Sequence, residues 1–102
     1  MVSEGDKFIK TAIPAIRIAV AELLSTKYKM SQKEIADGLG VTQAAVNKYL
    51  NGKYSSQINK IIARVRAAGF DNKIAEMVTS GKKISLVNEN IDNAAVHVYT
   101  SR

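Results

Sequence analysis

The side chains of this chain that are able to do chemistry are hydrogen-bonding groups rather than reactive ones. There is one histidine, His97, no cysteine, and nine carboxylates scattered along the sequence. Acid–base and nucleophilic catalysis need such groups in a cluster, so we expect no enzymatic activity. We likewise expect no metal site, because the absence of cysteine removes thiolate ligands. We expect no cofactor, since no glycine-rich phosphate loop is present. His97 lies in an apolar run, and we interpret it as structural.

Amide and ammonium groups gather instead on one short stretch, where Gln43 precedes Ala44 and Ala45 and is followed by Asn47 and Lys48. Side chains of these kinds donate and accept hydrogen bonds without reacting. Alanines beside them leave room for a close approach. This composition is typical of a surface that contacts a partner, so the elements that would position it matter.

Two helix-start signals precede and open this stretch. The sequence SQKE, beginning at Ser31, is a capping box, in which Ser31 and Glu34 satisfy each other's backbone N–H groups. Gly40 can adopt the left-handed conformation that ends a helix. Thr42 then caps a second helix, and Ala36 is small enough for the two helices to meet closely. The sequence therefore predicts a helix-turn-helix, a motif whose second helix presents its N-terminal residues to base edges in the major groove of DNA.

Positive charge is concentrated around the same motif. The whole chain has a net charge of +6. Between Lys27 and Arg66 there are eight basic residues and only two acidic ones, Glu34 and Asp37, so this segment alone carries the excess. A local excess of positive charge favours a polyanionic partner such as nucleic acid. The alternative is that the positive charge serves solubility alone and that the protein has no polyanionic partner.

Residues 31–52, SQKEIADGLGVTQAAVNKYLNG, resemble the helix-turn-helix of the lambda-repressor-like family of transcription regulators. With the preceding IPAIRIAVAELL, the stretch also resembles small predicted transcriptional regulators of archaea. The resemblance covers residues 12–53, and it implies a recognition helix at 42–51 and double-stranded DNA as the partner. Many of those archaeal relatives end in a cysteine-bearing tail, which this chain lacks, so metal binding is not carried over.

The resemblance also implies roles for single residues. Gln43 opens the recognition helix and can contact adenine through two hydrogen bonds, with Gln32 braced against it. Asn51 matches a position that holds phosphate, and Thr42 can donate to phosphate while it caps the helix. The complete set of expected DNA-binding residues is Gln32, Lys33, Thr42, Gln43, Ala44, Ala45, Asn47, Lys48, Asn51 and Lys53. For each of them, simple exposure on a solvated helix is the alternative, and the alanines can reflect helix propensity alone.

The rest of the chain predicts further helices and then a change of pattern. Apolar stripes indicate a first helix led by Pro14 after a partly loose segment 1–10, a fourth helix over 55–69, and a fifth that Asp71 caps and Gly81 ends. The β-branched runs KKISLV and AAVHVY, with NENIDN between them, predict a β-hairpin. Lys82 and Lys83 would then be wing residues that grip DNA or charges that protect an edge strand.

We therefore expect a mainly α protein. A five-helix domain at 1–81 would contain the helix-turn-helix, and a C-terminal β-hairpin at 82–102 would form a homodimer. Apolar residues are available for that interface; they are Ile74, Val78, Ile84, Leu86, Val96 and Val98. A dimer suits a protein whose single recognition helix reads only a few base pairs.

These features favour a sequence-specific DNA-binding transcription regulator. Two alternatives stay open: a DNA-coating architectural protein without sequence preference, and a protein-interaction module built on the same scaffold. No apolar run is long enough for a membrane helix and no signal peptide is recognisable, so we expect no membrane partner and a cytoplasmic location. The sequence identifies no effector ligand.

Overall fold

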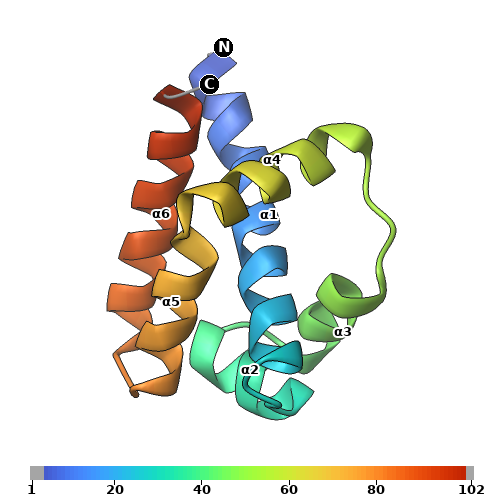
Figure 1. The fold of residues 1–102 in the computed structure, drawn as a ribbon, viewed down its shortest axis with the longest axis vertical. Coiled ribbons are helices and arrows are strands. Elements are labelled where there is room, and N and C mark those ends of the chain that lie inside the picture. Colours follow the sequence, from blue (N-terminus) through green and yellow to red (C-terminus); the bar gives the residue numbers. More distant parts are fainter. Residues whose placement is uncertain (1–3, 101–102) are drawn as a thin grey trace.

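The computed structural model describes residues 4–100, which form six α-helices grouped around α1 (Figure 1). The helices are α1 (Glu4–Thr26), α2 (Gln32–Leu39), α3 (Gln43–Asn51), α4 (Ser56–Ala68), α5 (Phe70–Thr79) and α6 (Ile84–Thr100). Residues 1–3 and 101–102, which are the outer ends of the two predicted regions, lie outside the described residues.

The first helix, α1, is the centre of the fold, because it contacts each of the other five helices. Alanines and branched side chains alternate along its buried surface, which lets neighbouring helices approach it from several sides; the buried residues are Ala12, Ala15, Ile16, Ile18, Ala19, Val20, Ala21 and Leu24. The prediction that this helix begins at Pro14 is wrong, since it begins at Glu4. Pro14 is exposed and removes one internal hydrogen bond. The helix continues past it because residues on both sides of Pro14 pack in the core.

The predicted C-terminal β-hairpin is also wrong: residues 84–100 form α6, and no strand occurs anywhere in residues 4–100. The buried residues of α6 recur at helical spacing; they are Val87, Ile91, Ala94, Ala95 and Val98. β-Branched residues prefer strands only where a sheet surrounds them, and an isolated hairpin would lack a surface to pack on. As a helix, the segment buries one continuous stripe, in part against α1.

For the helices α4 and α5, the prediction from sequence agrees with the structure in part. The predicted fourth helix is confirmed as α4, whose N-terminus is capped by the Ser55 hydroxyl. The prediction that Asp71 caps the fifth helix is wrong, because α5 begins at Phe70 and Asp71 is buried in its first turn. The His97 ring packs edge-on against Phe70 at 5.1 Å between ring centroids, which agrees with a structural role for His97.

A single cluster of buried apolar side chains extends from α1 to α6. The C-terminal helix is thus part of the same core as the helix-turn-helix. Lys82 and Lys83 lie in the turn between α5 and α6, so the wing and edge-strand roles predicted for them lose their basis. Within residues 4–100, no helix is both long enough and apolar enough to cross a membrane.

Candidate nucleic-acid interface

The N-terminus of α2 is fixed by the predicted capping box. The Glu34 backbone N–H donates to the Ser31 hydroxyl at 3.1 Å, and the Ser31 N–H donates to the Glu34 carboxylate at 2.9 Å. Because these bonds with Ser31 favour the ionised acid, they hold the pKa of Glu34 below its ordinary value. The first helix of the motif therefore starts at a defined residue.

The turn between α2 and α3 is closed by Gly40 and braced by the C-terminal helices. Gly40 has φ +68°, a left-handed conformation that glycine adopts without strain, and its N–H donates to the Ala36 carbonyl. A Cβ at Gly40 would lie 2.6 Å from Ile84 Cγ2, and one at Gly38 would lie 2.5 Å from Val78 Cγ1. Both glycines are therefore needed for close contact, and α5 and α6 set the position of the turn.

The recognition helix α3 is anchored on one side and open on the other. The Thr42 hydroxyl caps it by accepting from the Ala45 N–H at 3.0 Å. Val46 is completely buried. Most of the predicted contact residues of α3 lie in solvent; the exposed ones are Gln43, Ala44, Asn47, Lys48 and Asn51, whereas Ala45 is half-buried. This arrangement gives α3 one face for the core and one for a partner.

The structure links α2 to α3 through Gln32 and Asn47. The Asn47 side-chain amide donates to the Gln32 carbonyl oxygen at 3.5 Å, the long limit for such a bond. Within residues 4–100, no hydrogen bond joins Gln32 to Gln43. The predicted bracing of those two glutamines against each other therefore remains a prediction.

The C-terminus of α3 is closed by a residue that sequence reasoning missed, Tyr54. Its hydroxyl lies 2.7 Å from the Lys48 carbonyl and 3.1 Å from the Tyr49 carbonyl, both of which are acceptors at the end of the helix. Burial raises the pKa of Tyr54, and the nearby Glu22 and Tyr49 add to the effect. A Cβ at Gly52 would lie 2.7 Å from this hydroxyl. A tyrosine two residues after a helix-ending glycine was the only signal available.

Asn51 and Lys53 also lie near the C-terminal end of α3. The Asn51 amide donates to the Asn47 carbonyl at 3.0 Å, one turn earlier in the same helix. The other amide hydrogen of Asn51 is thus available to a phosphate. Lys53 is exposed in the segment between α3 and α4, close in sequence to the end of the recognition helix.

Two of the central basic residues are paired and the others are open. Lys33 lies 3.2 Å from Asp37, and Arg66 pairs with Glu22. Because both side chains of the Lys33–Asp37 pair are about 70% exposed, the pair contributes little to stability. Among the described residues, no ion pair involves Lys48, Lys53, Lys60 or Arg64.

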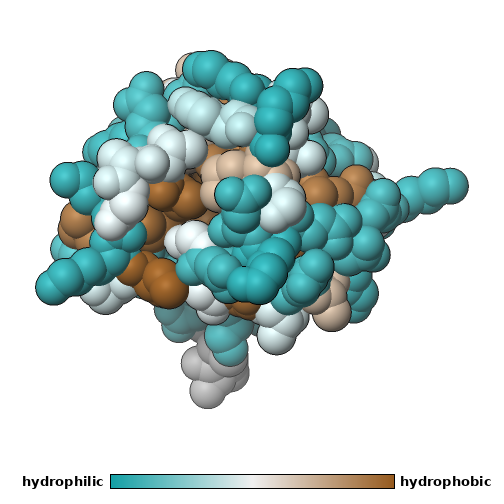
Figure 2. All heavy atoms as spheres, turned by 90° about the horizontal axis from the view of Figure 1, so that it is seen from below, coloured by the Kyte–Doolittle hydropathy of each residue, from teal (hydrophilic) through white to brown (hydrophobic). Residues whose placement is uncertain are grey.

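Figure 2 shows the end of the molecule that carries α2, α3 and the α5–α6 turn. Hydrophilic side chains cover much of this end, and apolar surface is exposed between them. Two exposed apolar residues belong to the start of α6: Ile84 is 42% exposed and Leu86 is 40% exposed. The polar surface of the motif thus borders a small apolar surface contributed by α6.

Comparison with known families assigns the motif. Residues 20–69 match the family model described as Helix-turn-helix. This stretch, from the second half of α1 to the corner after α4, is a lambda-repressor-like helix-turn-helix, as the sequence motif predicts. No curated protein and no solved structure gives a match. The resemblance to archaeal regulators stays a prediction.

The family match defines the class of protein. The chain is a DNA-binding helix-turn-helix protein. Members of this regulatory family are not typically enzymes. The geometry of α2, the turn and α3 is the arrangement by which such a motif places one helix across the DNA backbone and the next in the major groove.

Proposed function

We propose that this chain is a sequence-specific transcription regulator that inserts α3 into the major groove. One observation carries the proposal: Val46 fixes α3 to the core, while Gln43, Ala44 and Asn47 on its outer side are exposed. Amide side chains carry a donor and an acceptor each, the combination that adenine presents in the major groove. The two alanines let the helix approach the bases closely.

The neighbouring residues supply the contacts that hold the helix in the groove. Thr42, Asn51 and Lys53 lie at the two ends of α3, and Lys33 lies in the first turn of α2. Contacts from such positions to phosphates fix register without reading sequence. Lys48 is the exception, because a lysine on the recognition helix can reach either guanine or phosphate.

Selection of bound duplexes from a random pool tests the proposal. We expect a consensus sequence, and we expect Gln43→Ala to lose one base preference at a cost of about 1–3 kcal/mol in discrimination. The control is Asn72→Ala, which removes an exposed amide from α5, outside both the motif and the outward side of α6. Tight binding without a consensus would support the architectural alternative. Absence of DNA binding in the folded chain would support the interaction module.

The phosphate contacts are tested by salt dependence. Lys53→Ala should weaken binding to all sequences alike and lower the slope of log affinity against log salt by about one unit. Lys73→Ala is the matched control, because Lys73 is an exposed lysine on α5, outside the motif. A change in sequence preference with Lys53→Ala would rule out a pure phosphate role.

The proposal includes a homodimer formed through α6. Of the six apolar residues expected at the interface, Ile74, Val78 and Val98 are buried in the chain's own core. Leu86 and Val96 stay exposed at 40% and 48%. They share the outward side of α6 with Glu89 and Asn93, because helical positions seven and ten residues apart lie close to one face.

This outward side is self-complementary when two copies of α6 pair antiparallel. Positions equally distant from the middle of the helix then face each other, so Leu86 meets Val96 of the partner subunit and Glu89 meets Asn93 of the partner subunit. The Asn93 amide can donate to the Glu89 carboxylate. Because α6 contains no lysine or arginine, no positively charged side chain of this helix competes for that carboxylate. A two-fold dimer needs such a match of a surface with itself.

The absence of native cysteine makes the dimer testable by crosslinking. The double variant Leu86→Cys, Val96→Cys should form a disulfide-linked dimer on mild oxidation, whereas Asp92→Cys, on a neighbouring side of α6, should do so far less. Analytical ultracentrifugation that shows a monomer at tens of micromolar would contradict the dimer.

The dimer also makes a prediction about the DNA site. α1 lies between α3 and α6, which do not contact each other within residues 4–100 (Figure 1). Pairing through α6 therefore places the two recognition helices far apart, and we expect half-sites separated by more than one turn of DNA, which is about 34 Å. Selected sites with half-sites a single turn apart would exclude pairing through α6.

A further inference from the structure

A cleft lies between the N-terminal half of α1 and α4, away from the DNA-binding motif. Its volume is about 500 Å³, and its lining residues are Phe8, Gln57, Lys60, Ile61, Ala63 and Arg64. That size falls within the range of small-molecule sites. Phe8 belongs to the end of α1 opposite to α2 and α3, so the cleft is separate from the recognition helix (Figure 1).

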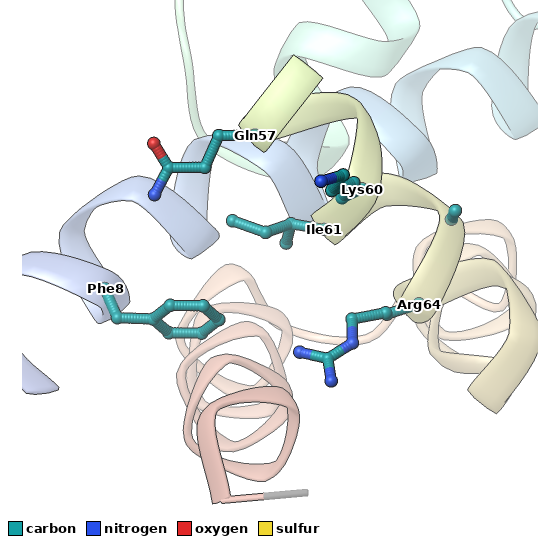
Figure 3. A pocket seen from close by; sticks show the side chains of 6 residues that line it. Phe8, Gln57, Lys60, Ile61 and Arg64 are labelled. Carbon is teal, nitrogen blue, oxygen red and sulfur yellow. The ribbon is translucent and has the colours of Figure 1, made fainter. Parts of the chain in front are cut away.

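The lining combines an apolar floor with a basic rim (Figure 3). The Phe8 ring reaches into the cleft from α1, and Ile61 and the Arg64 guanidinium point toward the same space from α4. Phe8 is half-buried and Ile61 is buried, whereas Arg64 is exposed. A ligand in this space would therefore meet an aromatic ring on one side and a positive charge on the other.

The rim carries two positive charges without a counter-ion. Lys60 and Arg64 are one helical turn apart on α4, a spacing at which like charges repel. Neither makes an ion pair with any residue in the range 4–100. A negative group between them would relieve the repulsion, and the Gln57 amide at the other side of the cleft can donate a further hydrogen bond.

We propose that this cleft binds a small organic acid that combines one carboxylate with an aromatic body. The planar guanidinium of Arg64 matches a carboxylate through two parallel hydrogen bonds, and Lys60 adds a point charge. The aromatic body covers Phe8 and Ile61. A free phosphate uses only the rim, and an uncharged apolar molecule uses only the floor, so the carboxylate and the ring together define the ligand class.

Titration with 2-naphthoate, followed by amide shifts in two-dimensional NMR, tests the proposal. We expect saturable shifts at Phe8, Ile61 and Arg64. Inorganic phosphate and 2-naphthalenemethanol, which carry only the charge or only the ring system, should bind much more weakly. Arg64→Gln should weaken naphthoate binding at least about tenfold, since it removes a charge-assisted bidentate contact, while Lys73→Gln should leave it unchanged.

Several results would overturn the proposal. Equal binding of 2-naphthalenemethanol would mean that the basic rim is not used. Shifts confined to α3 and the α3–α4 segment would mean that naphthoate binds the DNA-facing surface instead. Shifts at the cleft that depend on protein concentration without ligand would show that a second copy of the chain covers it. Urea unfolding of Arg64→Gln checks that any loss of binding is not a loss of folding.

Discussion

The two helices α3 and α6 represent opposite ways of holding a helix in one domain. α3 has 9 residues and a single buried side chain, Val46. Its two ends are closed by a hydrogen bond that the Thr42 hydroxyl accepts and one that the Tyr54 hydroxyl donates. α6 has 17 residues and five buried side chains on one stripe. The first helix depends on its ends, and the second depends on its buried face.

This difference follows from what each helix exposes. A helix that enters a groove must leave most of its side chains free, so burial can contribute little to its position. Capping groups and a tight turn then take over that task. α6 has no such requirement on its inner side, and it supports the motif by packing Ile84 against Gly40. Substitutions in the two helices should therefore separate folding from DNA recognition.

The largest effect is expected in the core of α6. Ile91 is completely buried, so Ile91→Ala should lower the free energy of unfolding by about 2–5 kcal/mol through lost apolar contacts and a cavity. Asp92→Ala, at an exposed neighbouring position, should change it by less than about 0.5 kcal/mol. Urea denaturation followed by circular dichroism measures both. Equal effects of the two variants would show that α6 is not packed through this stripe.

The next effect concerns the contact between the two regions. Gly40→Ala places a side chain at φ +68° and brings a Cβ within 2.6 Å of Ile84, so we expect a loss of about 2–4 kcal/mol of stability and weaker DNA binding. Gly81→Ala is the control, because Gly81 has φ +76° but no atom within 4 Å of an added Cβ. Its cost should be about 1–2 kcal/mol, from backbone strain alone. If both variants lose the same stability, the Ile84 contact does not constrain the turn.

The same comparison explains what was predictable from sequence. The start of α2, the turn at Gly40 and the start of α3 were predictable because caps and left-handed glycines act locally. Ser31, Gly40 and Thr42 each determine a bond within four residues along the chain. The matched family model covers the same stretch.

The C-terminal helix was not predictable in this way, because distant packing decides it. Ile84 with Leu86 and Val96 with Val98 alternate like strand residues, and that pattern concealed the helical stripe through Val87 and Ile91. The helix is selected over a strand by packing against α1 and its neighbours, which the local sequence does not report. The helix start predicted at Pro14 was wrong for a similar reason. Tertiary contacts stabilise α1 on both sides of Pro14, so the helix extends through it.

The sequence predicted that most polar residues of the candidate site lie exposed on the motif, but the contacts among them were not predictable. The contact between Gln32 and Asn47 and the closure of α3 by Tyr54 depend on how α2 and the α3–α4 segment are placed. Sequence spacing does not report such placements.

A smaller effect is expected at the end of α3. Tyr54→Phe removes the hydroxyl that donates to the carbonyls at this end, so stability should fall by about 0.5–1.5 kcal/mol, and DNA affinity should fall because Lys48 and Asn51 lose their fixed position. Tyr28→Phe is the control, since no hydrogen bond of the Tyr28 hydroxyl occurs within residues 4–100. Gel-shift titrations alongside urea denaturation separate the two readouts. Unchanged DNA affinity in a destabilised Tyr54→Phe would show that the end of α3 need not be closed for recognition.

The smallest effect is a pH dependence at the start of α2. The hydrogen bonds with Ser31 lower the pKa of Glu34 from its ordinary value of 4.5. Because the folded state holds the ionised form, this contribution to stability is fully present above pH 4.5 and is lost as the pH falls through the lowered pKa. Ser31→Ala removes the hydroxyl partner, so the pKa of Glu34 should move back toward 4.5, and carboxyl chemical shifts in an NMR titration measure it. The control variant is Ser55→Ala, which removes the hydroxyl that caps α4 and should leave the pKa of Glu34 lowered. A Glu34 pKa that is the same with and without the Ser31 hydroxyl would mean that the capping box does not hold α2 in solution. The start of the motif would then depend on burial, as α6 does.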